Sequence, residues 1–368
     1  MSYGFGDRLR TNARLSVAGV VLAVVLIGAP FVLGGFQTSL LTRTVIFALF
    51  ATAFNLLYGY TGLLSFGHAM FVAVAGYTVV KTFSVISPML GLSETAGGAA
   101  PLVILALAVV LGVIMSTVVA VLIGYLSVQL TEIYFALITL AFSMAIFVIF
   151  LQDAIGQVLA AFGIGNGNFS NGSDGLTFVP GNVDLFGWEF ALVNLIDPIA
   201  FYFISLLVVA VGIFLLWRII RSPFGMVCQA IRENPERAEA LGINVTFHQW
   251  VTFVISGAFS GLAGTLLVTL AGNVNPEAHA HWSFSANPVL MTIIGGPYSF
   301  VGPALGAFTF EYVRWFIRQF PLLEEHWEFS LGILLLVVVL FFDNGVAGGI
   351  DWLRERVGGD QGTAEPAD

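Results

Sequence analysis

Long runs of apolar residues recur along the whole chain. The first extends from Ser16 to Gly35. Further runs lie at roughly 43–58, 62–83, 101–126, 133–151, 198–217, 248–271, 286–298, 300–318 and 329–343. A helix of about 20 apolar residues crosses the hydrocarbon core of a bilayer. The pattern therefore predicts an all-α polytopic membrane protein with about ten transmembrane helices.

Two of these runs differ from the others. The runs 286–298 and 300–318 are short and are interrupted by glycine and proline. Glycine and proline are tolerated in membrane segments when neighbouring groups satisfy the freed backbone. The sequence leaves open whether this region is one long bent span or a re-entrant pair.

The composition excludes a soluble domain. The chain is 58% hydrophobic and 10% charged, whereas soluble proteins carry about 25% charged residues. The net charge of −9 argues against a nucleic-acid partner, which needs clustered cations. Cys228 is the single cysteine, so an intramolecular disulfide is impossible. Lys81 is the single lysine, which suggests a halophilic prokaryote or, alternatively, drift from Lys to Arg in a GC-rich genome.

Basic residues predict the orientation in the cell membrane, because cytoplasmic loops are enriched in Lys and Arg. The N-terminal arm 1–15 carries three arginines, and we expect it to be cytoplasmic. The segment 152–198 contains five acidic residues and no basic one, so we expect it outside. The loop 218–247 carries four arginines and should be cytoplasmic. Ten spans through the domain 16–345 return the polar tail 346–368 to the cytoplasm.

The loop 218–247 contains the signals of a short helix from Pro235 to Leu241. Asn234 is a good N-cap, and Pro235 fits the first helical position. Gly242 can end the helix in a left-handed conformation. Ala238 and Leu241 are three residues apart and share one face. Since so short a helix is unstable alone in water, we expect this face to dock into a cytoplasmic partner, the alternative being a plain connector.

Four blocks in order resemble the branched-chain amino-acid permease family of ATP-binding-cassette importers, in its LivM-like branch. The blocks are Asn55–His68 (NLLYGYTGLLSFGH), Tyr134–Phe142 (YFALITLAF), Ser222–Asn244 (SPFG, then AIREN and RAEALGIN) and Phe253–Gly264 (FVISGAFSGLAG). The resemblance covers roughly residues 45–345.

The resemblance implies a permease subunit without an enzyme activity of its own. Its partners would be a second homologous permease, two ATP-binding subunits that use ATP and Mg, and an extracytoplasmic substrate-binding protein. No GxxxxGK[ST] loop for ATP occurs in this chain. The ATPase-coupling residues would be Arg232, Glu233, Asn234, Arg237, Ala238, Glu239, Ala240, Leu241 and Gly242.

A Gly-rich polar stretch inside the membrane region is the candidate substrate pathway. It comprises Gly59, Tyr60, Thr61, Gly62, Ser65, Gly67 and His68. Glycines here allow a break in the helix, whose freed backbone could line a pore. The alternative is close helix packing, with His68 hydrogen-bonded inside the bundle.

Few charged side chains fall inside the predicted spans. Glu311 and Arg314 are one turn apart, and we expect a structural ion pair rather than a substrate contact. His279 and His281 near Glu277 form only a weak metal motif without a firm third ligand.

Two other functions stay open. A urea or short-chain amide permease belongs to the same superfamily. An ion-coupled secondary transporter belongs to a different class and would need intramembrane carboxylates or histidines near the midplane, whereas the predicted spans offer mainly His68, Glu311 and Arg314.

Overall fold

The computed structural model describes residues 24–91, 100–130, 132–163, 168–178, 184–185, 188–189 and 197–320, with single positions between 329 and 348. The predicted arm 1–15 lies outside the described residues, as do most of the run 329–343 and most of the tail 346–368. The first predicted run, 16–35, is described from residue 24, and residues 24–32 are helical.

The described part of the chain contains 6 helical segments long and apolar enough to cross a membrane. They are α2 (Gly35–Thr61), a continuous segment of α3 (Ala69–Lys81), the π-helical η1 (Thr82–Ile86) and α4 (Ser87–Met89), then α5 (Ala100–Ser127), α6 (Glu132–Leu151), α8 (Pro198–Ile220) and α11 (Val245–Ala271). The predicted all-α membrane fold is therefore supported, whereas the predicted count of about ten spans is not confirmed.

The two uncertain runs form a pair of short helices rather than one bent span. Helix α13 (Trp282–Gly295) has 14 residues and α14 (Gly302–Ile317) has 16. Residues 296–301 separate them, because Gly296 and Pro297 end the first helix. The two helices pack directly against each other and against α2.

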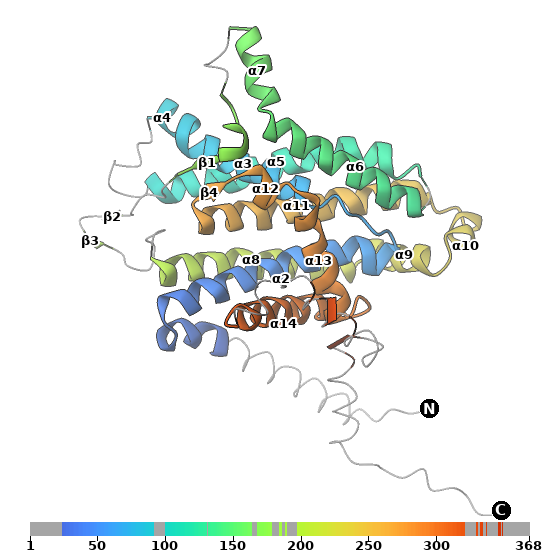
Figure 1. Ribbon diagram of the computed structural model, residues 1–368. Helices are drawn as coiled ribbons and strands as arrows, with labels where there is room; N and C mark the ends of the chain where they lie inside the picture. The colour runs from blue at the N-terminus through green and yellow to red at the C-terminus, as the bar shows by residue number, and fades with distance from the viewer. Residues whose placement is uncertain are drawn as a thin grey trace, which may run out of the picture.

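Short elements lie at the two ends of the bundle (Figure 1). One end carries α7 (Ala154–Ala161), η2 (Gly172–Asp174), α12 (Pro276–His279) and a strand pair, β1 (Leu176–Thr177) with β4 (Asn273–Val274). A second antiparallel pair joins β2 (Asp184–Leu185) and β3 (Trp188–Glu189). Helices α9 (Pro223–Glu233) and α10 (Pro235–Ala240) lie at the opposite end. We name these the α7 end and the α10 end; the acidic and the basic loop are thus on opposite sides, as the charge pattern requires.

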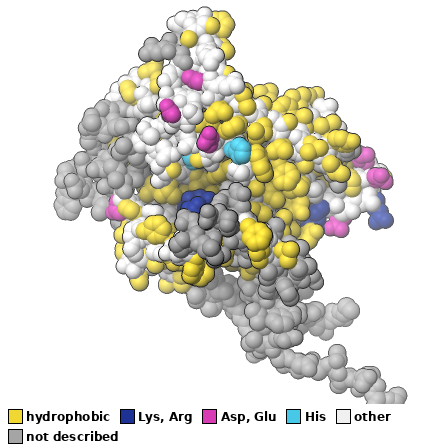
Figure 2. Space-filling view, viewed as in Figure 1, with side chains coloured by type: hydrophobic (Ala, Val, Ile, Leu, Met, Phe, Trp, Pro, Cys, Tyr) yellow, Lys and Arg dark blue, Asp and Glu magenta, His cyan; other side chains and the backbone are white. Residues whose placement is uncertain are grey.

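Helix α2 lies at the centre of the bundle, and the outer helices cover it. Phe47, Phe50 and Phe54 on α2 are fully buried. By contrast, Leu122 on α5 and Leu207 on α8 are exposed by more than half. Figure 2 shows hydrophobic side chains over much of the described surface. An apolar surface of this kind suits lipid rather than water.

Glycines set the closest helix contacts, as the spacing of small residues predicts. A Cβ on Gly261 would lie 2.3 Å from Ser116 Oγ on α5, and one on Gly257 would lie 2.6 Å from Ala120 Cβ. A Cβ on Gly306 would lie 1.8 Å from the backbone oxygen of Met291 on α13. At Gly306 the contact is with the backbone of α13, whereas Gly257 and Gly261 meet the side chains of Ala120 and Ser116; a larger residue at any of the three requires its neighbour to move.

Candidate functional site

The loop between α8 and α11 folds into two consecutive helices, α9 and α10. The side chain of Asn234 accepts a hydrogen bond from the Arg237 amide at 2.8 Å, and Pro235 follows as the first helical residue. Gly242 adopts φ 85° just after the helix. Both end signals read from the sequence are therefore present, and the predicted short helix is confirmed to within one residue at its end.

The prediction that Ala238 lies on the docking face of α10 is wrong. This side chain is 2% exposed and packs with Ile231 of α9 and Val245 of α11. Leu241 is 82% exposed instead. The physical reason is that α10 folds back on its own neighbours, which occupy one side of a helix barely two turns long. The exposed coupling residues are Glu233, Arg237, Glu239, Ala240, Leu241 and Gly242, whereas Arg232 and Asn234 are half-buried.

Arg232 links this element to the end of α2. Its Nη1 donates a hydrogen bond to the backbone oxygen of Gly59. Its guanidinium lies 5.0 Å from the ring centre of Tyr298, in the segment between α13 and α14. Its Nη2 also pairs with the exposed Glu233 at 2.7 Å. The single side chain thus joins α9 to the end of α2 and to the segment between α13 and α14.

The Gly-rich stretch breaks the helical backbone, as expected. Gly62 adopts φ 79° and ends α2, and regular helix resumes only at Ala69. Side chains satisfy backbone groups in the break: Gly67 donates to Ser65 Oγ at 3.2 Å, and Ala69 donates to Ser285 Oγ at 2.8 Å. The candidate pathway residues Gly59, Tyr60, Thr61, Ser65, Gly67 and His68 are buried, and Gly62 is half-buried.

His68 lies fully inside the bundle. Its Nε2 is 2.9 Å from Ser256 Oγ, and that hydroxyl donates to the Ala53 carbonyl at 2.7 Å. The serine oxygen therefore accepts from His68 Nε2–H. The rings of Phe54 and Phe71 meet the imidazole edge-to-face, with centroids at 5.0 and 5.6 Å. This geometry fits the packing alternative for His68.

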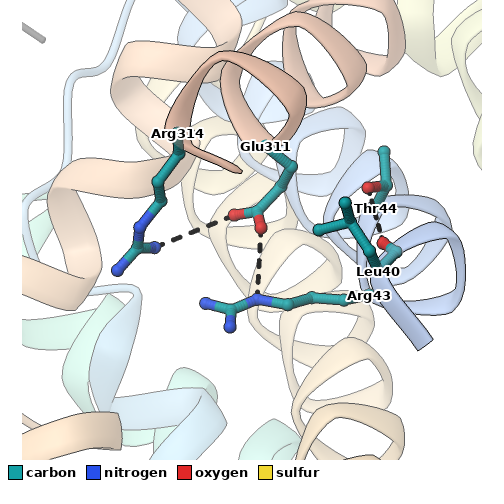
Figure 3. Close-up of polar contacts among 5 residues, drawn as sticks. All are labelled: Leu40, Arg43, Thr44, Glu311 and Arg314. Carbon is teal, nitrogen blue, oxygen red and sulfur yellow. Dashed lines mark hydrogen bonds and ion pairs between the residues drawn. The ribbon is translucent and has the colours of Figure 1, made fainter. Parts of the chain in front are cut away.

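Charged side chains meet in a cavity at the α7 end. Glu311, which is 2% exposed, lies 3.2 Å from Arg43 Nε and 3.9 Å from Arg314 Nη1 (Figure 3). The predicted pair with Arg314 is present, but Arg43 on α2 makes the shorter contact and escaped the sequence reasoning. The only indication of this contact in the sequence was the position of Arg43 at the start of the apolar run 43–58. No cluster of three His, Cys, Asp or Glu side chains in the described residues could hold a metal ion.

Comparison with known proteins identifies the family. Residues 36–339 match the family model described as branched-chain amino acid transport system / permease component. The branched-chain amino-acid permease LivM of Salmonella typhimurium is 26% identical over 352 residues, which cover 89% of this chain and 73% of that protein.

Two further relatives match, one of them over a shorter stretch. LivH of Escherichia coli is 25% identical over 82% of this chain and 91% of that protein. A nucleoside permease of Lactococcus lactis, NupC, is 28% identical over 28% of this chain and 32% of its own. No solved structure matches the chain significantly. Since the family model spans most of the chain, this protein belongs to the family of branched-chain amino-acid transport system permease components.

Proposed function

We propose that this chain forms part of the translocation pathway of an ATP-driven importer of branched-chain amino acids. Two ATP-binding subunits would hydrolyse ATP with Mg at the α10 end, in the cytoplasm. A second permease would complete the pathway, and an extracytoplasmic substrate-binding protein would deliver the substrate to the α7 end. The two relatives LivM and LivH are both permeases of one kind of system, which supports a paired arrangement.

The exposed α9–α10 element carries this proposal. Leu241 offers an apolar side chain that is 82% exposed, beside a helix whose other side is already packed. An apolar group of this size contributes about 1.5–3 kcal/mol when a partner buries it. Behind it, Arg232 contacts the Gly59 carbonyl at the break of α2. A displacement of α10 by a partner would therefore be transmitted through Arg232 to Gly59 in the candidate pathway.

The branched-chain substrate is supported by matches that cover most of the chain. LivM relatives align over most of the chain, whereas the nucleoside permease aligns over less than a third of it. A urea or amide substrate remains the second candidate within the superfamily. In the described residues, the buried carboxylate Glu311 is already held by two arginines. This favours the importer over an ion-coupled carrier, which needs a carboxylate free to bind its ion.

The test compares two substitutions in α10 and one control. Leu241→Asp changes an exposed side chain, so the chain should insert normally while recovery of the ATP-binding subunits and leucine uptake fall roughly tenfold or more. Ala238→Asp buries a charge among Ile231 and Val245 and should disrupt the element itself. Gln229→Ala, on the exposed side of α9, should behave as wild type.

The measurements are membrane abundance, co-purification of the ATP-binding subunits and uptake of labelled leucine by cells. If Leu241→Asp kept full uptake and full subunit recovery, α10 would be a connector and the docking proposal would fall. Uptake by the purified chain in liposomes without any ATP-binding subunit would instead indicate a carrier or channel.

A further inference from the structure

A cavity of about 670 Å³ opens at the α7 end of the bundle. Its walls come from the first half of α2, the last turn of α11, α12, the start of α13 and the second half of α14. Arg43 lies about 12 Å along α2 from the first residue of the helix, so the cavity reaches well into the bundle. Sites for small organic molecules have volumes of roughly 300–1,000 Å³. The cavity is thus of the right size for a small solute.

The charges in the cavity are unequal. Three arginines (Arg43, Arg314 and Arg318) and two glutamates (Glu277 and Glu311) line it. Glu311 is buried between Arg43 and Arg314, so its charge is already compensated. Figure 2 shows basic side chains close to a histidine and an acidic side chain on this face of the molecule. The carboxylate of a ligand would therefore meet a surplus of cations in this cavity.

Arg43 is arranged to bind such a group. Its Nε faces Glu311, which uses one of the five N–H donors of the guanidinium (Figure 3). The side chain is 39% exposed, so the other donors are accessible from the cavity. Glu311 therefore positions the guanidinium, and Arg318, which is exposed at the same cavity, adds a second cation. A carboxylate can accept two N–H groups of one guanidinium at once.

The rest of the cavity is apolar. Phe47 and Phe284 pack with ring centroids 6.0 Å apart, and Leu267 and Leu270 of α11 line the same space. Glu277 is exposed on α12 and takes part in no ion pair among the described residues. The cavity thus combines a cationic wall, an apolar wall and one available carboxylate.

We infer that this cavity binds a small aliphatic α-amino acid, with the carboxylate on Arg43 and Arg318, the ammonium group near Glu277 and the side chain against the phenylalanines and leucines. The permease itself would then select its substrate, in addition to any delivery protein. This inference rests on the proposed function, because it names the recognition site for the same substrate. A neutral sugar or nucleoside gains nothing from the excess of cations.

The test measures binding of labelled L-leucine to the purified full-length chain in lipid nanodiscs. The competitors are 4-methylpentanoate, which lacks the amino group, leucinamide, which lacks the carboxylate, and adenosine. Excess leucine should displace the label fully, and 4-methylpentanoate should displace it less well than leucine because it lacks the ammonium group for Glu277. Leucinamide and adenosine should displace at least tenfold less than leucine. Equal competition by leucinamide, displacement by adenosine, or no saturable leucine binding would overturn the inference.

Substitutions locate the site. Arg318→Gln leaves the contacts of Glu311 intact and should weaken leucine binding at least tenfold, which is about 1.4 kcal/mol. Arg43→Gln should have at least the same effect, and Arg43→Lys should retain part of the affinity because it keeps the charge. Lys81→Gln is the matched control: this basic side chain lies over Phe169 at the α7 end but outside the cavity. Wild-type binding by Arg318→Gln and Arg43→Gln would refute the assignment.

Uptake by the complete assembly separates the two proposals. If wild-type assemblies transport leucine and the two arginine variants do so with an unchanged KM, the cavity is not the recognition site and the importer proposal stands. If the wild-type assembly transports no leucine at all, the proposed function fails first.

Discussion

Replacing Arg232 with glutamine should disconnect the α9–α10 element from the bundle without exposing any apolar surface. The side chain donates to the Gly59 carbonyl and lies over Tyr298. A hydrogen bond from a charged donor contributes about 1.5–3 kcal/mol. An exposed cation–π contact contributes about 0.5–1 kcal/mol. The exposed pair with Glu233 adds little.

These contributions set the size of the effect. Because the Arg232 side chain is 25% exposed, we take the lower end, about 2 kcal/mol. That value shifts the equilibrium between the connected and the disconnected arrangement roughly 30-fold. If the Arg232 contacts transmit the movement that ATP hydrolysis drives in the ATP-binding subunits, leucine uptake per ATP hydrolysed should fall by up to this factor. The ATP-binding subunits should still co-purify.

The assay is uptake and ATP hydrolysis by reconstituted assemblies. Arg232→Lys should be intermediate, because lysine keeps the charge but loses the planar fork of donors. Gln229→Ala, one turn earlier on the same helix, serves as the control. Wild-type uptake per ATP by Arg232→Gln would refute the reasoning.

Three other predictions concern topology, packing and pH. A reporter fused after Gly172 should read outside and one after Asn234 inside; both on one side would overturn the orientation. Gly306→Ala should lower the free energy of unfolding of the solubilised protein by about 1–3 kcal/mol, since its Cβ would meet the Met291 carbonyl. Gly35→Ala is the control and should not lower it, because the nearest atom to its Cβ is 3.9 Å away. Burial alone would raise the pKa of Asp153, but hydrogen bonds from Ser170 and Phe169 outweigh it and lower this pKa. Because its folded-state pKa is lowered, ionised Asp153 stabilises the folded loop at pH values above its ordinary pKa of about 3.9, and this stabilisation is lost as the pH falls. Hydrogen exchange at the Ser170 amide, corrected for its intrinsic rate, should therefore accelerate in acid. The Asp153→Asn variant should show no such acceleration.

The sequence predicted the features that depend on a few consecutive residues. Asn234, Pro235 and Gly242 define the ends of α10 through local backbone and capping preferences. The break after Gly62 was also expected, because a cluster of glycines and polar residues interrupts an apolar run. The long helices followed from apolar length alone.

Contacts between distant segments could not be predicted in this way. Ala238 is buried because Ile231 and Val245 close over it, and helix periodicity carries no information about such neighbours. Arg43 and Glu311 come from helices far apart in the chain, so their ion pair depends on how α2 and α14 pack. Hydropathy likewise could not decide whether 286–318 was one element or two, since it does not report where Gly296 and Pro297 end a helix.

The last two turns of α2, just before the interruption 62–68, contact the segment 296–301 that separates α13 from α14. A Cβ on Gly59 would lie 2.3 Å from the Pro297 carbonyl, and Asn55 donates to the Ser299 carbonyl at 3.4 Å. In both places, side chains rather than the helical ladder hold the backbone. Bending a continuous helix breaks several ladder bonds at once, whereas motion here exchanges individual side-chain bonds. Arg232 of α9 contacts both places from the α10 end, so a displacement of α9 would act on the end of α2 and on the α13–α14 connection together.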